Sequence, residues 1–500
     1  MKSLETLEAA AGWLEGLINL ERAPQTPYRR LSLEPVTRLL ERLGHPERGL
    51  SAIHLAGSKG KGSTALLAES VLRAAGERVG TFTSPHLESW TERFRIDGAE
   101  VQPADLVRAL DAIRPHVEAL RADPTAPDPS FFDATTAAAL LLFRDAGVDR
   151  AILEVGLGGR LDSTNVVDTA VSCITSIELE HTDRLGDTLA AIAGEKAGIV
   201  KPGRPVVTGR LPAEAAEVVA ARAAQLGAPL FVLGRDFELE IVGDSTLFGV
   251  HLRVRDGDLE VEVSLPVAGR HQAENAALAL ACVRRLGACT TTALGDAARR
   301  GLASAALPGR IEVLGERPWL VVDGAHTERS AAALADALAC VPRRHTRLVL
   351  SISADKRLEA ILARLLPLAD EVFVTRADPI RSLDPAQLAR AVHTLAPALS
   401  FHAVPNPDMA VRVACEGLGR TICCWSRGRS IWRGSRGGSC AAALSNRAYR
   451  KARTESPRRP RGERYPVRAS VGETPGPRPR EGHEGRGSRP GRKSLSPLRP

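Results

Sequence analysis

Short apolar runs alternate with longer amphipathic stretches along most of the chain. The apolar runs predict buried strands, and the stretches between them, with apolar residues three or four apart, predict helices that cover a sheet. We expect strands at Ala52–Leu55, Arg78–Thr83, Arg150–Val155, Val171–Ile177 and Pro205–Thr208. Strands that alternate with helices in this way are typical of an α/β fold with a mainly parallel sheet.

The pattern changes after this first sheet. Phe231–Leu265 alternates apolar and polar positions between Gly and Asp turns, which predicts a small antiparallel ribbon. Helices are expected at His271–Leu286 and Thr291–Leu302, and Ala303–Pro308 is expected to form a hinge. The first domain is therefore predicted to span residues 1–302.

A second α/β unit follows the hinge. Its expected strands and helices alternate over Trp319–Val322, Glu328–Ala339, Arg347–Ser351, Leu358–Leu366, Glu371–Thr375 and Pro385–Leu395. This alternation predicts a Rossmann-like α/β domain at residues 303–416. Two α/β domains joined by a hinge leave a cleft, which is a favoured place for small substrates.

The charge of the chain is unevenly distributed. The 500 residues carry a formal net charge of +8, but residues 417–500 hold 21 of the 67 Lys and Arg residues and only 5 of the 59 Asp and Glu residues. Residues 1–416 are therefore mildly acidic, at −8, and the segment after them is strongly basic, at +16. With few apolar side chains, residues 417–500 predict a disordered basic tail of the kind that binds nucleic acid.

The cellular compartment is predicted from what the sequence lacks. No apolar run is long enough to cross a membrane. The first residues include Glu5 and Glu8 and show no basic and apolar regions of a secretory signal. The eight cysteines form no C-x-x-C pair, a pattern that fits reduced thiols. We expect a cytoplasmic protein.

The segment from Ile53 to Thr64 is the most specific in the chain. It reads Ile-His-Leu-Ala-Gly-Ser-Lys-Gly-Lys-Gly-Ser-Thr, an apolar strand and a glycine-rich turn that lead into a helix. Such a turn points backbone N–H groups at phosphate oxygens, and the helix N-terminus adds a favourable dipole. A turn without a ligand is the alternative, but a lysine and two hydroxyls at this spacing favour a nucleoside triphosphate. The predicted phosphate-binding residues are Gly57, Gly60, Lys61, Gly62, Ser63 and Thr64, with Ser63 or Thr64 in reach of Mg²⁺.

Polar residues follow other strands of the same predicted sheet. Ser84, Glu154 and His181 all lie just past or at a strand end, where parallel sheets gather ligand groups. A carboxylate there is costly to bury without a compensating cation, so Glu154 is a candidate Mg²⁺ ligand, with a structural ion pair as the alternative. Lys196 stands in a weakly polar helix, where a lysine loses its proton more readily and its neutral amine can react.

Four residues of the second half stand at the edges of predicted elements. Asn275 opens a helix, Arg310 enters the second domain, and Asp323 and His326 close its first strand. Each alone has a structural explanation, such as a turn or a helix cap. Their joint order along the chain is what points to a site.

Together these segments resemble the folylpolyglutamate synthase and dihydrofolate synthase family, relatives of the Mur peptide ligases. The matching segments are Gly-Lys-Gly-Ser-Thr, Thr-Ser-Pro-His-Leu, Glu-Val-Gly-Leu-Gly-Gly-Arg-Leu-Asp-Ser-Thr-Asn, Glu-Lys-Ala-Gly-Ile, Gly-Arg-His-Gln, Pro-Gly-Arg and Asp-Gly-Ala-His, in family order over roughly residues 30–400. The resemblance implies an ATPase-like P-loop domain and ATP-dependent amide formation. A carboxylate attacks the γ-phosphate of ATP, and the amine of glutamate then displaces phosphate from the acyl phosphate.

The resemblance also implies a metal site. Ser84 and Glu154 would hold one Mg²⁺ ion and His181 a second. Lys196 matches a lysine that becomes carbamylated in this family, which turns a cation into a carboxylate-like group that helps to hold metal. Lys196 and Lys61 are two of the three residues expected to act in catalysis.

The remaining roles concern the nucleotide and the acceptor. By resemblance, Asn275 and Arg310 would contact ATP, and Asp323 would contact the ribose or nearby groups. His326 would act at the reacting end, as the third catalytic residue. The expected substrates are ATP, L-glutamate, and dihydropteroate, a reduced folate, or both, and the expected assembly is a monomer.

Three departures from the family pattern are visible. Ser58-Lys59 stands where the family usually has Thr-Asn, which adds a positive charge beside the phosphates. Glu180 replaces the usual Asp before the metal-site histidine, and Thr327-Glu328 replaces Asn-Pro after Asp-Gly-Ala-His.

The chain also departs from the family at its end, where a strand and a Gly-Ser segment are expected. There are codons for Ile422-Cys423-Cys424-Trp425 that encode Leu-Leu-Leu when they are read in another phase. With GC-rich codons, the other phase over 419–434 reads Pro-Asp-Asp-Leu-Leu-Leu-Val-Ala-Gly-Ser-Leu-Tyr-Leu-Ala-Gly, which resembles the missing ending. We therefore hypothesise a frameshift after roughly residue 417, which would remove the last strand of the second domain. Genomic DNA sequence decides between this and a genuine tail.

Three functions stay open at this point. A folate-pathway ligase is favoured. A Mur-type ligase is the nearest rival, although only about fifty residues precede the phosphate loop, where a UDP-binding domain is expected. The third is an inactive ATP-binding protein whose basic tail binds nucleic acid. No nucleic-acid partner is expected unless that tail is genuine.

Overall fold

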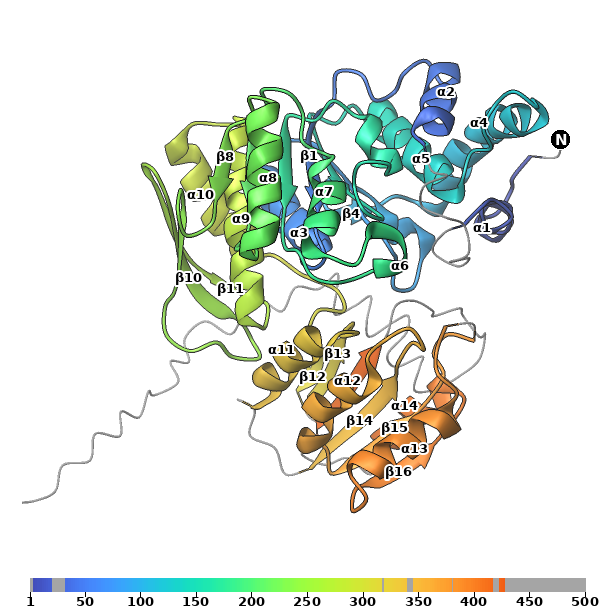
Figure 1. Cartoon of the computed structure of the whole chain (residues 1–500), viewed down its shortest axis with the longest axis vertical. Coiled ribbons are helices and arrows are strands. Elements are labelled where there is room, and N and C mark those ends of the chain that lie inside the picture. The colour runs from blue at the N-terminus through green and yellow to red at the C-terminus, as the bar shows by residue number, and fades with distance from the viewer. Residues whose placement is uncertain are drawn as a thin grey trace, which may run out of the picture. The chain divides into compact units, whose positions relative to one another are not determined.

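The computed structural model describes residues 3–19, 32–316, 319–339, 345–379, 381–416 and 422–427. All of them belong to one compact unit, Met1–Lys451. They form an eight-stranded sheet, a three-stranded sheet and a six-stranded sheet (Figure 1). The prediction of an α/β fold with a mainly parallel first sheet, an antiparallel ribbon and a second α/β domain is confirmed.

The eight-stranded sheet has the strand order β4-β3-β2-β5-β1-β6-β7-β8. Six neighbouring strands are parallel: β2 (Val79–Phe82), β5 (Arg150–Glu154), β1 (Ser51–Ala56), β6 (Val171–Ile174), β7 (Val206–Thr208) and β8 (Leu230–Val232). An antiparallel hairpin, β3 (Phe94–Ile96) and β4 (Ala99–Glu100), closes one edge. The prediction that the ribbon starts at Phe231 is wrong, because β8 extends the parallel sheet instead.

Helices cover both faces of this sheet, because alternate strand residues point to opposite sides. Ile53 and Leu55 of β1 pack into one core cluster, whereas Ala52 packs into another. The first face carries α3 (Lys61–Ala74), α9 (Arg270–Leu286) and α10 (Thr291–Ala303). The opposite face carries α1 (Leu7–Glu15), α2 (Glu34–Arg42), α4 (Pro103–Ala122) and α5 (Phe131–Ala146), with α6 (Thr182–Leu185), α7 (Leu189–Ala197) and α8 (Ala213–Gln225) packed beside β6.

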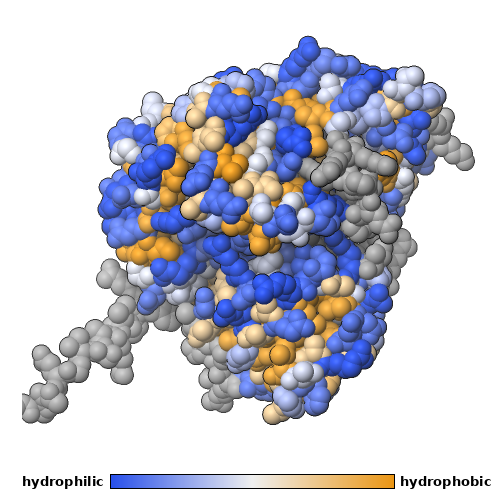
Figure 2. Space-filling view, viewed as in Figure 1, coloured by the Kyte–Doolittle hydropathy of each residue, from blue (hydrophilic) through white to orange (hydrophobic). Residues whose placement is uncertain are grey.

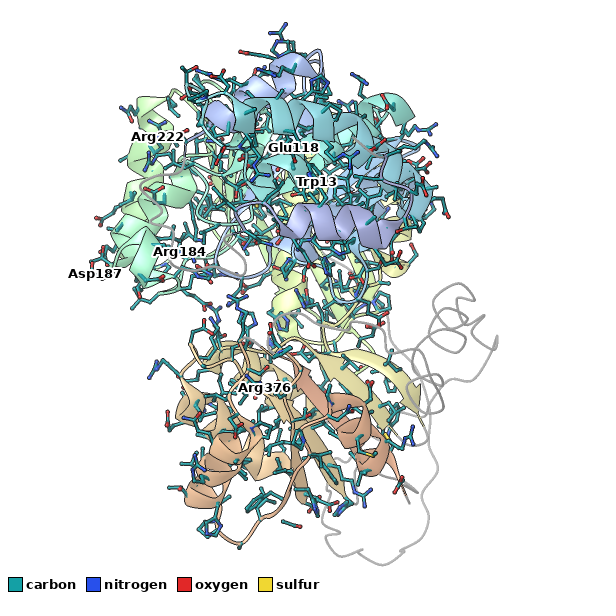
Figure 3. The ribbon with its side chains drawn as sticks, turned by 90° about the vertical axis from the view of Figure 1, so that its right-hand side faces the viewer. Trp13, Glu118, Arg184, Asp187, Arg222 and Arg376 are labelled. Atoms are coloured by element: carbon teal, nitrogen blue, oxygen red, sulfur yellow. The ribbon has the colours of Figure 1, made fainter. Side chains whose placement is uncertain are left out.

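The N-terminal helix is fixed to the rest of this domain by a polar contact. The indole N–H of Trp13 in α1 donates to Glu118 Oε1 in α4 over 2.9 Å, and both side chains are labelled in Figure 3. Tryptophan buries a large apolar ring while its N–H keeps a partner. Helix α1, which was not among the predicted elements, is thus held against α4 within the predicted first domain.

The antiparallel ribbon links the two domains. It consists of β9 (Glu238–Ile241), β10 (Val250–Asp256) and β11 (Leu259–Leu265) and packs on α9 and α10. Leu247, in the loop before β10, is buried in the hydrophobic cluster of the second domain. The ring of its neighbour Phe248 lies 5.2 Å from the ring of Trp319. The ribbon is thus part of the contact between the domains.

The six-stranded sheet has the order β12-β13-β17-β14-β15-β16. Its strands are β12 (Glu312–Glu316), β13 (Trp319–Asp323), β17 (Ile422–Arg427), β14 (Thr346–Ser351), β15 (Glu371–Val374) and β16 (Ser400–Ala403), parallel apart from β12. Helices α11 (Glu328–Ala339), α12 (Leu358–Leu365) and α13 (Pro385–Leu395) cover one face, and α14 (Pro407–Cys415) covers the other. The three strands and three helices predicted for this domain, β13, β14, β15, α11, α12 and α13, match the structure in position. The elements β12, β16, α14 and β17 were not predicted.

The last strand corrects the prediction of a disordered tail from residue 417. Ile422–Arg427 forms β17 in the middle of the sheet, paired with both β13 and β14. The gap between two parallel strands exposes N–H and C=O groups on both sides, and any extended segment of suitable length can satisfy them. The expected loss of the domain's last strand is therefore also wrong. Residues 417–421 and 428–500 lie outside the described residues, and the frameshift stays a hypothesis.

In the part of the chain that the structure describes, no helix is both long and apolar enough to cross a bilayer. On the face drawn in Figure 2, hydrophilic and hydrophobic residues are interspersed.

The central place of β17 leads to a test by truncation. A chain that ends at Glu416 would leave the facing edges of β13 and β14 unpaired, so we expect its second domain to unfold. A chain that ends at Arg427 keeps β17 and serves as the control. In calorimetry the shorter chain should lose the enthalpy of a domain of roughly 100 residues, about 60–80 kcal/mol. Equal unfolding enthalpies for the two chains would show that β17 does not hold the sheet together.

Candidate functional site

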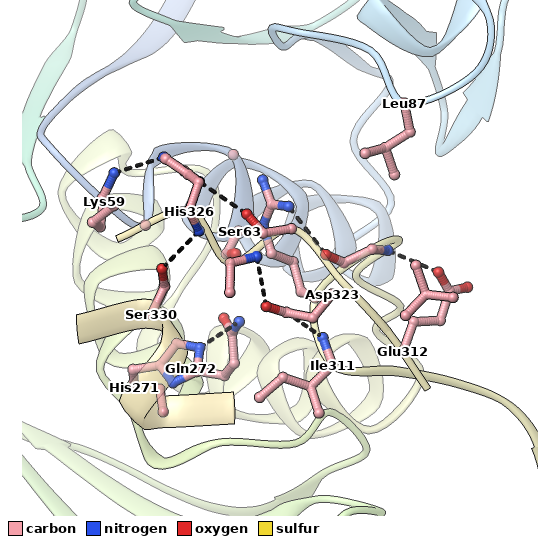
Figure 4. Close-up of a pocket in the computed structure, with 18 of the residues that line it drawn as sticks. Lys59, Ser63, Leu87, His271, Gln272, Ile311, Glu312, Asp323, His326 and Ser330 are labelled. Atoms are coloured by element: carbon pink, nitrogen blue, oxygen red, sulfur yellow. Dashed lines mark hydrogen bonds between the residues drawn. The ribbon is translucent and has the colours of Figure 1, made fainter. Parts of the chain in front are cut away.

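A cavity of about 300 Å³ lies where strands of both large sheets end (Figure 4). Loops and helices of the first domain and the first turn after β13 line it together. Of the residues predicted from the sequence, it is lined by Gly60, Lys61, Gly62, Ser63, Ser84, Glu154, Asn275, Arg310, Asp323 and His326. Most of the predicted site is therefore brought to one place.

The glycine-rich turn joins β1 to α3, and two of its positions have no room for a side chain. Gly57 and Gly60 have φ angles of +151° and +88°, a region that favours glycine. A Cβ on Gly57 would lie 2.0 Å from Thr175 Oγ1, and one on Gly60 would lie 2.4 Å from Asn275 Oδ1. The turn thus requires glycine at these positions for both its backbone path and its close packing.

The end of β6 fixes the path of this turn. The Ser58 N–H donates to the Ser176 carbonyl over 2.8 Å, and the Lys59 N–H donates to Ser176 Oγ over 2.9 Å. The Thr175 hydroxyl donates to the Lys59 carbonyl. The turn is held by backbone groups and by two hydroxyls that sequence reasoning had not singled out.

Helix α3 begins at Lys61 directly after the turn. Gly60, at the N-cap of this helix, has no side chain that could bond to the N–H groups of the first turn. Those groups have no partner inside the helix and are suited to an anion. The Lys61 ammonium donates to the Gly57 carbonyl over 2.8 Å and so lies folded over the turn.

Ser84 and Glu154 lie side by side, as expected for residues at the ends of parallel strands. The Ser84 N–H donates to Glu154 Oε2 over 3.0 Å. The carboxylate also lies against the start of α3, because a Cβ on Gly62 would lie 3.2 Å from Glu154 Oε2. Glu154 is only 6% exposed. A buried carboxylate with a serine beside it presents the oxygen ligands that Mg²⁺ prefers.

His181 is less clearly part of this group. It is not among the residues that line the cavity, and it starts the short helix α6 with a φ of +47°. Among the described residues, no three His, Cys, Asp or Glu side chains gather as a metal site. A second ion at His181 stays a prediction.

Lys196 is buried in the last turn of α7 and paired with Glu180. Its ammonium lies 3.1 Å from Glu180 Oε1 and only 2% of the residue is exposed. Burial lowers the pKa of Lys196 to about 8, against the opposing effect of Glu180. Roughly a tenth of the amine is then neutral at pH 7. The lowered pKa expected for this lysine agrees with its surroundings, and its reactivity stays a prediction.

Glu180 is the centre of three positive charges. Burial alone would raise its pKa, but Lys196, Lys61 and Lys59 outweigh burial and hold the pKa of Glu180 well below its usual range. Lys59 Nζ lies 3.5 Å from Glu180 Oε2. Glu180 thus holds three ammonium groups together near the phosphate-loop turn.

Asn275 supports the turn from α9. Its Nδ2 donates to Gln272 Oε1 over 2.8 Å, and its Oδ1 accepts from the Thr64 hydroxyl over 3.5 Å. Thr64 itself is fully buried and does not line the cavity. Gln272 is a site residue that sequence reasoning missed, although it belongs to the Gly-Arg-His-Gln segment.

Asp323 fixes the entry into the second domain. One carboxylate oxygen accepts the Ile311 N–H over 2.8 Å, and the other accepts the Ala325 N–H over 2.7 Å. Ile311 has a φ of +48°, which is strained for a β-branched residue. Burial raises the pKa of Asp323, which Arg310 opposes. The carboxylate thus holds the backbone of Ile311, the residue after Arg310, beside the cavity; a contact with ribose stays a prediction.

His326 follows β13 and faces the phosphate-loop turn. Its Nδ1 lies 2.9 Å from the Gly324 carbonyl, and its Nε2 lies 2.9 Å from Lys59 Nζ. Its backbone N–H donates to Ser330 Oγ over 3.1 Å, as Figure 4 shows. Thr327 Oγ1 in turn accepts the Ser330 N–H. Thr327, which stands where the family usually has Asn, therefore caps helix α11.

Comparison with known proteins gives the family. The family model "Mur ligase middle domain" matches residues 55–283, and "Mur ligase, glutamate ligase domain" matches residues 309–424. The dihydrofolate synthase/folylpolyglutamate synthase of Mycobacterium tuberculosis is 38% identical over 377 residues, which cover 72% of this chain and 77% of that protein. The chain belongs to the dihydrofolate synthase/folylpolyglutamate synthase family.

Solved structures of this family agree with the fold. The Mycobacterium tuberculosis folylpolyglutamate synthase complexed with ADP superposes with a TM-score of 0.76 at 33% identity, over 84% of this chain and 95% of that one. A bifunctional folylpolyglutamate synthase/dihydrofolate synthase with Mn, AMPPNP and L-glutamate bound gives a TM-score of 0.72 at 33% identity, over 85% and 96%. The resemblance stated from sequence motifs is confirmed.

The packing of the turn can be separated from its backbone strain. Gly60 and Gly76 have nearly the same φ, +88° and +90°, but a Cβ on Gly76 would meet no atom within 4 Å. Gly76→Ala should therefore cost only the left-handed strain, about 1–2 kcal/mol of unfolding free energy. Gly60→Ala should cost at least about 1 kcal/mol more, because Asn275 must move. Denaturant unfolding measures both; equal losses would show that the turn is not packed against Asn275.

Proposed function

We propose that this chain is an ATP-dependent ligase that joins L-glutamate to dihydropteroate, to reduced folates, or to both, through an acyl phosphate. The observation that carries the proposal is the cavity, in which a phosphate-loop turn, the Ser84–Glu154 pair and His326 of the second domain face one another. Family membership supports the reaction type. The choice of acceptor is not decided by either.

The residues of the first domain account for nucleotide binding. The N–H groups at the start of α3 suit the phosphates, and Lys61 can leave the Gly57 carbonyl for a phosphate oxygen. Transfer of a phosphoryl group depends on such neutralisation and on alignment more than on covalent help from the protein.

A divalent ion fits the Ser84–Glu154 pair. Both residues line the cavity beside the first turn of α3, where they offer a buried carboxylate and a hydroxyl as oxygen ligands. When bound there, Mg²⁺ would supply charge for the transferred phosphoryl group. We propose a second ion held through His181 and a carbamylated Lys196; what supports the latter is the depressed pKa of its amine.

The second domain supplies the other wall of the cavity. His326 is proposed to act at the reacting end, and Arg310 beside the nucleotide. An acyl phosphate is lost to hydrolysis when water reaches it, so a site enclosed from two sides favours attack by the glutamate amine. We propose that the two domains close around the substrates for this reason.

The proposal is tested by phosphate release from ATP. We expect release that depends on both L-glutamate and a pteroyl acceptor, because the acyl phosphate forms on the acceptor carboxylate. Dihydropteroate and tetrahydrofolate, assayed separately, decide which acceptor is used. A UDP-linked peptidoglycan precursor serves as the control for a Mur-type ligase. Release with the precursor alone, or with none of the three, would contradict the proposal.

Lys196 gives a separate test. A neutral amine attacks CO₂, so the carbamate at fixed CO₂ pressure should increase as pH rises through about 8, the pKa of Lys196. We expect a ¹³C carbamate signal in protein equilibrated with ¹³C-bicarbonate that is absent from Lys196→Ala, together with a loss of turnover of about 100-fold or more in that variant. Equal ¹³C spectra from the two proteins would exclude carbamylation at this site.

A further inference from the structure

Lys59 lies at the tip of the phosphate-loop turn, between groups from two domains. Its ammonium is 2.9 Å from Nε2 of His326, which follows the second domain's β13. On its other side it is 3.5 Å from Glu180 Oε2, in the first domain. About a quarter of the side chain is exposed, 26%, so the ammonium is largely enclosed by these partners.

The backbone of Lys59 is held independently of its side chain. Its N–H donates to Ser176 Oγ over 2.9 Å, and its carbonyl accepts from the hydroxyls of Ser176 and Thr175. The turn therefore keeps its path when the side chain of residue 59 changes. This makes Lys59 suitable for substitution, because the loss of the ammonium can be separated from damage to the turn.

The contacts of His326 determine which of its two ring nitrogens carries the proton. The Gly324 carbonyl can only accept a hydrogen bond, so Nδ1 must carry the proton. An ammonium can only donate, so Nε2 accepts from Lys59. The imidazole is thus fixed at both nitrogens, one by its own domain and the other by the phosphate-loop turn.

We propose that Lys59 is a positioning residue for the ligation, which holds His326 at the reacting end of the cavity through Nε2. The proposal rests on the proposed function of the chain. Glu180 steadies the ammonium from the opposite side, and Lys61 and the start of α3 remain to bind nucleotide. Loss of Lys59 should therefore slow turnover and leave nucleotide affinity nearly unchanged.

The experiment compares three variants of the full-length chain. Lys59→Met keeps the length of the side chain and removes its charge, whereas Lys59→Arg keeps a donor that can reach His326. Arg329→Gln is the matched control, because Arg329 forms another ion pair between the domains, 3.0 Å from Glu178 Oε1, with a side chain that is 71% exposed. If the loss of any ion pair between the domains were enough to slow turnover, Arg329→Gln would lower kcat as much as Lys59→Met does.

Kinetics give the main result. Lys59→Met should lower kcat for glutamate-dependent phosphate release about 10- to 100-fold, the usual cost of a misplaced group. ADP affinity, measured by calorimetry, should stay within threefold, Lys59→Arg should recover most of kcat, and Arg329→Gln should stay within twofold of the unchanged chain. Added to His326→Ala, Lys59→Met should cause no further loss, because both remove one contact. A kcat within twofold in Lys59→Met, or losses that multiply in the double variant, would overturn the proposal.

A second measurement does not depend on activity. The ¹⁵N resonance of His326 Nε2, identified by its disappearance in His326→Ala, should shift in Lys59→Met and not in Arg329→Gln. If the unchanged chain releases no phosphate with either acceptor, the proposed function fails, and this resonance still reports the contact. An unmoved resonance in Lys59→Met would show that Lys59 does not bond to His326 and would overturn the proposal by itself.

Discussion

The site depends on one constraint, the common direction of the parallel strands β1, β2, β5 and β6. Because these strands run the same way, the residues that follow them meet along one edge of the sheet. The glycine-rich turn, Ser84, Glu154 and Ser176 come from four separate parts of the chain and are neighbours for this reason. The second sheet repeats the arrangement, since His326 follows the carboxyl end of its parallel strand β13.

Three lysines lie around Glu180 at this edge of the sheet. Lys59, Lys61 and Lys196 surround Glu180, so positive charge is gathered around this one carboxylate. Repulsion among like charges that are partly buried is unfavourable. The pairing with Glu180 lowers this cost in the free protein. The same arrangement explains why an additional lysine at position 59 is tolerated: it pairs with Glu180 and with His326 of the other domain.

The sequence predicted the parts of this arrangement that follow local rules, and it missed those that depend on distant contacts. Ser84 and Glu154 were expected to meet because strand ends meet, and Lys196 was expected to lose its proton more readily because its helix is weakly polar; both agree with the structure. The support of Gly60 by Asn275 and of Ile311 by Asp323 joins residues far apart in sequence, and no local pattern shows it. The strand β17 was missed because its residues precede a basic, low-complexity segment, although pairing in mid-sheet needs only extended backbone.

The central claim is that phosphate is transferred to the acceptor's carboxylate before glutamate attacks. It is tested most directly with an acceptor labelled with ¹⁸O in both oxygens of that carboxylate, incubated with ATP and L-glutamate. In an acyl phosphate one carboxylate oxygen bridges carbon and phosphorus, and it leaves with phosphorus when the amine attacks carbon. The account predicts one ¹⁸O atom in each inorganic phosphate released, measured by mass spectrometry. Phosphate that contains no ¹⁸O while the amide product forms would contradict it.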